Sequence, residues 1–166
     1  MIKINRAFAA LLASARDRWL LKLKLRRKRH IVRLANIAEG THDGNITKAV
    51  DAIITERHLL AKIGSASDRI AVCGSADTPI GVITDEAPAI GDWVNLALLG
   101  SSRSTLRMVA AAAITQGALL EPAASGRVQT LGAGAGTHHV VGRALDSATA
   151  AGEVIEVDPL YFLRVI

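Results

Sequence analysis

The chain has 166 residues, half of them hydrophobic but only 3% aromatic, and its net charge is +5. A chain of this length can bury a core without metal or disulfide support, and that core must be built from Ala, Val, Ile and Leu. The single cysteine, Cys73, excludes an internal disulfide framework. No uncharged apolar run approaches the roughly 20 residues that span a membrane, so we expect a soluble, intracellular protein.

The charge is divided unevenly along the chain. Residues 1–34 contain eleven of the twenty Lys and Arg residues but only one of the fifteen acids, Asp17, so this segment carries +10. The remaining 132 residues contain 9 basic and 14 acidic side chains and carry −5. We therefore expect two parts, a basic amphipathic arm over residues 1–40 and a β-rich body over residues 41–166.

The arm has the pattern of an amphipathic helix over residues 1–25. Its apolar side chains recur at steps that keep them on one face: Phe8, Leu11, Leu12, Ala15, Trp19 and Leu23. The end of this segment is ambiguous, because leucines alternate with lysines over residues 21–25 as they would in a strand. A lone helix of this kind is only marginally stable in water. We therefore expect the arm to become ordered against a partner.

The basic side chains of the arm are the predicted partner-binding residues. They are Arg16, Arg18, Lys22, Lys24, Arg26, Arg27, Lys28 and Arg29. An anionic protein surface or a nucleic-acid backbone would attract them electrostatically, and a membrane-surface helix or an organelle transit peptide has a similar pattern. A solvated extension, or a start codon placed too far upstream, is the remaining interpretation. The arm's sequence alone leaves these alternatives open.

The body consists of short β-rich runs separated by Gly, Asp, Ser and Pro. Strands are predicted over residues 52–63, 69–73, 80–84, 93–99, 106–111, 118–121, 127–131, 139–145 and 154–157. This spacing favours an all-β fold, either a compact sandwich or a small barrel of short antiparallel strands. Turn residues such as Ser125 and Gly126 predict hairpins. The Ala-rich run 109–114 is equally compatible with a short helix, and 132–136 is predicted to be a loop of small residues.

Histidine and cysteine side chains give no metal or nucleophile pattern. His138 and His139 are adjacent, so on a strand they point to opposite faces, and no other histidine has a partner at metal-ligand spacing. Surface or locally hydrogen-bonded histidines are the favoured interpretation. Cys73 lies in an apolar run and is predicted to be a buried small hydrophobe rather than a nucleophile.

The remaining candidate groups are carboxylates and a Gly-rich loop. Asp85 and Glu86 are neighbours that face opposite ways on a strand, and Glu153 and Glu156 lie near a turn, so solvated acids are predicted at both places. The loop 132–136 lacks the lysine and the hydroxyl of a phosphate-binding loop. We expect no catalytic residue, no cofactor and no bound metal.

The segments of the body follow a specific order. They are RHLLAKIG at 57–64, DRIAVCG at 68–74, DTPIGVITDEA at 77–87, GDWVNLALLG at 91–100, AITQGALL at 113–120, SGRV at 125–128, VGRAL at 141–145 and AGEVIEV at 151–157. In order and spacing the body resembles the small capsid decoration proteins of tailed phages, also called cement or capsid fibre proteins. The resemblance covers residues 41–159 and does not include the basic arm.

The resemblance implies a non-enzymatic structural protein that binds an assembled phage or prophage capsid shell and reinforces it. Its partners would be the major capsid protein and further copies of itself, a trimer being one option. Its location would be the virion, or the bacterial cytoplasm during assembly. The alternative is a nucleic-acid-binding protein in which the arm contacts nucleic acid and the body is an oligomerisation platform. A membrane partner is disfavoured.

Overall fold

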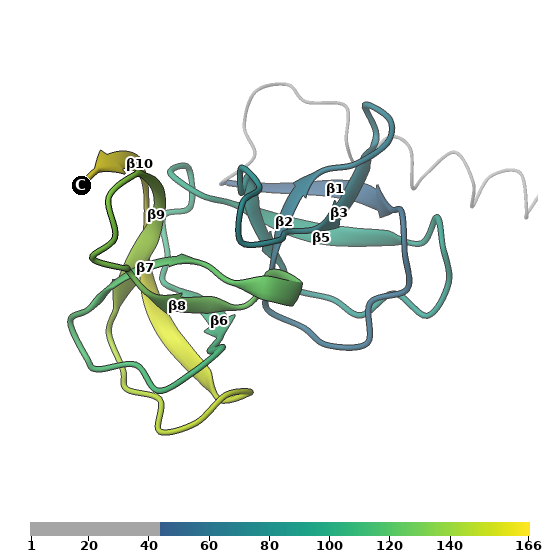
Figure 1. Cartoon of the computed structure of the whole chain (residues 1–166). Helices are drawn as coiled ribbons and strands as arrows, with labels where there is room; N and C mark the ends of the chain where they lie inside the picture. Colours follow the sequence, from purple (N-terminus) through teal and green to yellow (C-terminus); the bar gives the residue numbers. More distant parts are fainter. Residues whose placement is uncertain (1–43) are drawn as a thin grey trace, which may run out of the picture. The chain divides into compact units, whose positions relative to one another are not determined.

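The computed structural model describes residues 44–166, which form two β-sheets (Figure 1). The predicted helix over 1–25 and the basic partner-binding residues from Arg16 to Arg29 lie outside the described residues. Within 44–166 the predicted all-β class is confirmed, since the one helical element there is the 3-10 turn η1 (Ala124–Gly126).

The first sheet closes into a five-stranded barrel. Its strands are β1 (Asn45–Val50), β2 (Leu59–Ile63), β3 (Arg69–Val72), β4 (Gly81–Ile83) and β5 (Trp93–Leu98), in the order β1-β3-β2-β4-β5, and β5 pairs with β1 to close the ring. The prediction of antiparallel strands throughout is wrong at one place, where β1 and β3 run parallel. The β2–β3 hairpin inserts β3 between β2 and β1, and β3 then runs in the direction of β1.

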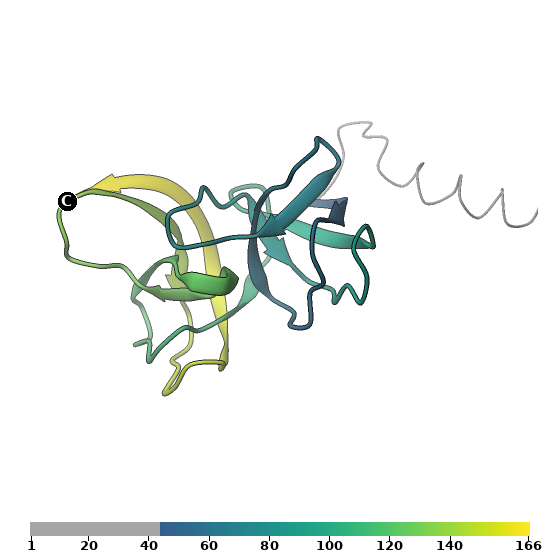
Figure 2. The ribbon, with the colours of Figure 1, turned by 45° about the vertical axis from the view of Figure 1, so that its right-hand side comes forward.

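The second sheet has five strands whose pairings are all antiparallel, and a parallel bridge from Ala110, just after the first of them, reaches Val128 in the last. Its strands are β6 (Leu106–Val109), β10 (Val154–Val165), β9 (Thr137–Ala144), β7 (Leu119–Pro122) and β8 (Val128–Thr130), in the order β6-β10-β9-β7-β8. Figure 2 shows β10 as a long, curved strand at the C-terminal end of the chain. The described part is therefore a five-stranded barrel with a second sheet that shares a core with it, so the predicted small barrel accounts for β1 to β5 only.

Most predicted strands are confirmed to within two residues, but one strand is missed and three predictions are wrong. Strand β1 is missed because its sequence, NITKAV, buries only its last two residues and so lacks a clear apolar pattern. The strand predicted over 52–63 begins only at Leu59, and the final strand continues past Val157 to Val165. No helix forms over 109–114, because Ala110 and Ile114 make isolated β-bridges instead.

Strands β2, β4 and β5 are buried on both faces. Alternate residues point to opposite sides of a strand, so Leu59, Ile83 and Leu96 lie in the barrel core, together with Val109 from the end of β6. Their neighbours form a second core with side chains of the second sheet: Leu60, Val82 and Ala97 from the barrel, with Met108, Leu120, Val128 and Ile155 among those from the sheet. This double burial explains the continuous apolar runs in these barrel strands.

The turn between β7 and β8 contacts the barrel directly. Ser125 has φ 59° and Gly126 has φ 72°. Both values lie in the left-handed region, where glycine is favoured because it has no side chain. The Gly126 N–H donates to the carbonyl of Cys73 at 2.7 Å. A Cβ atom added to Gly126 would lie 2.8 Å from Val72 Cγ1 and 2.9 Å from Leu59 Cβ. Only glycine fits between the turn and strands β2 and β3.

Replacing Gly126 by alanine should therefore destabilise the fold. The clash and the left-handed backbone together are expected to lower the free energy of unfolding by about 2 to 4 kcal/mol. A side chain at Gly117 would meet open space, but the backbone there has φ 84°. Gly117→Ala should therefore lower the free energy of unfolding by only about 1 kcal/mol. Gly134→Ala, which meets neither constraint, is the control and should change stability by less than about 0.5 kcal/mol. Urea unfolding measures all three, and equal midpoints for Gly126→Ala and Gly134→Ala would contradict this account.

Candidate docking surface

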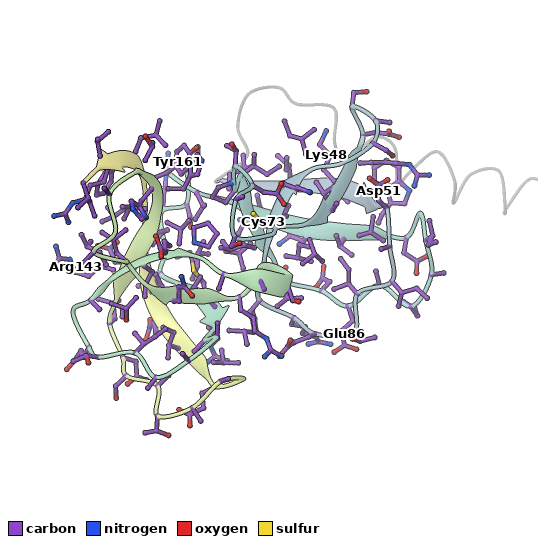
Figure 3. All side chains as sticks on the ribbon, viewed as in Figure 1. Lys48, Asp51, Cys73, Glu86, Arg143 and Tyr161 are labelled. Atoms are coloured by element: carbon purple, nitrogen blue, oxygen red, sulfur yellow. The ribbon has the colours of Figure 1, made fainter. Side chains whose placement is uncertain are left out.

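The thiol of Cys73 is inaccessible to reactants. Its side chain is buried between the barrel and the second sheet (Figure 3) and its sulfur lies 3.4 Å from the Gly74 carbonyl oxygen. Burial, with a smaller effect from Asp77, raises the pKa of the thiol to about 11. The prediction of a buried small hydrophobe is confirmed.

The predicted solvated acids are exposed and bind separate partners. Asp85 accepts a hydrogen bond from the backbone N–H of Asn95 at 3.0 Å, whereas Glu86 pairs with Arg57 at 3.1 Å. Glu153 accepts from Thr149, and Glu156 accepts from Thr105 at 2.6 Å. Neither Asp85 with Glu86 nor Glu153 with Glu156 forms a carboxylate dyad, because each acid has its own partner. Among residues 44–166 no three His, Cys, Asp or Glu side chains gather as a metal site, and no helix there is long and apolar enough to span a bilayer.

The second sheet contains one ionisable pair that the sequence patterns do not predict. Glu121, on β7, is buried, and its Oε2 lies 2.7 Å from His138 Nδ1. Its Oε1 accepts from Gln129 Nε2 at 2.9 Å and from the Gly132 N–H at 3.2 Å. The other ring nitrogen of His138, Nε2, lies 2.9 Å from the Gly134 carbonyl oxygen. The pair therefore connects β7, β8 and β9 to the loop 132–136, whose predicted lack of regular structure is confirmed.

The partners of Glu121 and His138 favour the charged form of each. Burial by itself would raise the pKa of Glu121, but hydrogen bonds from Gln129, His138 and Gly132 outweigh it and hold that pKa below its ordinary value. The Glu121 carboxylate, followed by the Gly134 carbonyl, raises the pKa of His138 above its ordinary value. The sequence signal for this pair is an acid placed inside the apolar run of β7.

The largest group of exposed apolar side chains lies at the end of β10. There β9 and β10 continue as a two-stranded ribbon, paired from Phe162 with Val140 to Val165 with Thr137. We call residues Leu160 to Ile166 the C-terminal ribbon strand. Tyr161, Phe162, Leu163, Val165 and Ile166 are between 41% and 78% exposed. Tyr161, labelled in Figure 3, stacks on His139 with ring centroids 6.1 Å apart.

Two features make this ribbon strand suited to a protein partner. Strand β6 pairs with β10 only over Val154–Val157, so among the described strands nothing pairs with the outer edge of the ribbon strand. The register shift between Pro159 and Phe162 marks a β-bulge, which bends the strand where it leaves the core. Apolar groups gathered on an open edge are typical of interaction sites. The sequence LYFLRV at 160–165 carries this signal, but the predicted strand ends at Val157.

Known proteins provide two similarities. A family model described as phage cement protein matches residues 43–159, which include β1 to β9 and the part of β10 before the bulge. Among solved structures the chain is similar to the head fiber gp8.5 N base of bacteriophage phi29, with 15% sequence identity and a TM-score of 0.45, covering 68% of this chain and 90% of that chain. No curated protein matches the sequence.

The burial of Cys73 predicts an unreactive thiol in the native protein. At neutral pH a thiol-specific reagent should modify native protein at least about a hundredfold more slowly than protein unfolded in urea, because the thiolate is both scarce and covered. The rate should increase along the urea unfolding curve. Fast labelling of a protein that is fully folded by circular dichroism would contradict the structure.

Proposed function

The chain belongs to the phage cement protein family, and we propose that it is a non-enzymatic structural protein that binds an assembled phage or prophage capsid shell and reinforces it. The observation that carries this proposal is the family match over residues 43–159, which spans nearly all of the described body. The protein would act in the virion, after binding the shell in the bacterial cytoplasm during assembly.

The C-terminal ribbon strand is our proposed contact with the shell. It presents five exposed apolar side chains and only one charged residue, Arg164. A surface of this kind gains free energy when it is removed from water against another protein, at about 25 cal/mol per Å² of apolar area. Nucleic acid, whose outer surface is anionic, does not provide such a partner. The ribbon therefore fits the major capsid protein.

We further propose that the protein acts as a homo-oligomer, for which a trimer is one arrangement. In the second sheet β6 and β8 are the outer strands, and the bridge from Ala110 to Val128 joins them at one residue pair, so no other described strand pairs with the rest of either edge. Exposed edges promote pairing with other chains unless they are covered. Symmetric association of several copies on a shell would cover them and would present several shell contacts at once.

The basic arm is our proposed second contact. Its net charge of +10 over residues 1–34 would bind an acidic patch on the shell or on a neighbouring copy. Two linked contacts raise the apparent affinity, because the second contact forms at a high effective concentration once the first has formed.

The same charge also favours the alternative function of nucleic-acid binding through the arm. The body offers only Trp93, Tyr161 and Phe162 as aromatic residues, which is a poor basis for stacking bases. A gel shift with duplex and single-stranded DNA at low and high salt tests this alternative. The absence of a shift at low salt would rule it out.

An acidic side chain in the ribbon should weaken shell binding. Leu163→Asp places a charge in the proposed contact and should lower the affinity for purified capsids about tenfold to a hundredfold, as expected for the lost burial of one large apolar side chain. Ile63→Asp is the matched control, because Ile63 is 68% exposed at the end of β2; it should leave binding unchanged. Co-sedimentation measures both, and equal binding by the two variants would remove the ribbon from the interface.

Neutralising the arm should change the salt dependence of binding. Replacing Arg26, Arg27, Lys28 and Arg29 by glutamine should weaken capsid binding about tenfold at low salt and very little at high salt, where charges are already screened. Deletion of residues 1–40 should give the same flat response to salt. If the deletion leaves binding unchanged across the whole salt series, the arm is not a shell contact.

A further inference from the structure

His138 has a hydrogen-bond acceptor at each of its two ring nitrogens. Nδ1 faces the Glu121 carboxylate at 2.7 Å and Nε2 faces the Gly134 carbonyl at 2.9 Å. A backbone carbonyl accepts hydrogen bonds and cannot donate them, and the same is true of an ionised carboxylate. The hydrogen bonds from Gln129 and the Gly132 N–H to its other oxygen favour the ionised form of Glu121 and hold its pKa below the ordinary value. A neutral imidazole has one N–H and can donate only one of these bonds, so with an ionised Glu121 the geometry favours the doubly protonated ring.

The charged ring holds together the loop 132–136 and the end of the ribbon. Gly132 is bound to Glu121, and Gly134 is bound to His138. Gly136 then exchanges two backbone hydrogen bonds with Ile166, at 3.1 Å and 3.0 Å. The loop is rich in glycine and has little packing of its own, as no atom lies within 4 Å of a Cβ added at Gly134. Its conformation therefore depends on these few polar contacts.

We propose that protonated His138 is a pH-dependent latch that fixes the loop 132–136 and the adjoining end of the C-terminal ribbon strand in one conformation, and that loss of its proton releases them. The role of the latch in shell binding rests on the proposed function of the ribbon, because a fixed ribbon presents its apolar side chains to the shell without an ordering cost. The latch itself is a property of the free protein.

The charged groups that face His138 set the range in which the latch is closed. They are Glu121 from β7 and Arg164 from β10, while β8 contributes the neutral Gln129. Hydrogen bonds to Glu121 and Gly134 raise the pKa of His138 above its ordinary value of 6.5, although burial and Arg164 oppose this. The hydrogen bonds to Glu121 keep its pKa below the ordinary 4.5 despite burial.

These two directions fix the sign of the effect. Because the folded pKa of His138 is raised, its contribution to stability is fully present below pH 6.5 and is lost as the pH rises through the folded pKa. Because the folded pKa of Glu121 is lowered, its contribution is present above pH 4.5 and is lost as the pH falls through the folded value. The latch is therefore closed in mildly acidic solution and opens toward alkaline pH.

Two measurements on the free, full-length protein test the latch. Imidazole nitrogen NMR should show both ring nitrogens of His138 protonated at about pH 6 and a titration midpoint above that of an unperturbed histidine. Hydrogen exchange, expressed as protection factors that correct for the intrinsic effect of pH, should show at least about a tenfold loss of protection for 132–136 and 162–166 between about pH 6 and pH 9. Protection of the barrel strands should stay constant over this range.

Variants at the two adjacent histidines separate the latch from general effects of pH. His138→Gln should make the protection of 132–136 independent of pH, whereas His139→Gln should retain the wild-type response. The proposal is overturned if His138 titrates at or below the ordinary value, or if His138→Gln keeps the wild-type pH response. Should His138→Gln fail to fold, the wild-type titration still decides. These measurements contain no capsids, so they test the latch independently of shell binding. A negative capsid-binding result would not contradict the latch, and a negative latch result would not contradict shell binding.

Discussion

The fold of residues 44–166 depends on the close fit of one turn against the barrel. Strands β7 and β8 bring Gly126 within hydrogen-bonding distance of Cys73, in a space that has no room for a side chain. This contact aligns the second sheet with the outer faces of β2, β4 and β5, so that a single core forms between the sheets. Because packed cores tolerate little change in separation, a Cβ atom at this residue would force the turn away from the barrel and disturb that core.

Strand β10 lies in two different environments along its length. From Val154 to Val157 it is held between β6 and β9, and Ile155 and Val157 are buried in the core. After the bulge it pairs only with β9, and its apolar side chains face solvent. The family match ends at Pro159, at the start of this bulge. The core portion thus lies within the family match, and the ribbon lies beyond it.

Sequence patterns predict the parts of this fold in which local signals and tertiary environment agree. The strands around Ile83 and Leu96 have long apolar runs and clear turns, and they are found as expected. Strand β1 and the pair of Glu121 with His138 are not predicted, because both depend on contacts with residues distant in the chain. Ala110 to Ile114 has helical propensity, but bridges to Val128 and Ala148 override it. The ribbon is missed because its apolar residues are consecutive and exposed, so they lack the alternation of apolar and polar residues that a strand against a core would show.

The two environments of β10 have a mechanical consequence. A load applied along the axis of β10 would act in shear on the hydrogen bonds to β9 and β6, which lie across that axis. Under such a shearing load the bonds along the strand share the force and must break together, unlike a hairpin that is unzipped one pair at a time. The connection between ribbon and core is thereby oriented to resist tension along the strand.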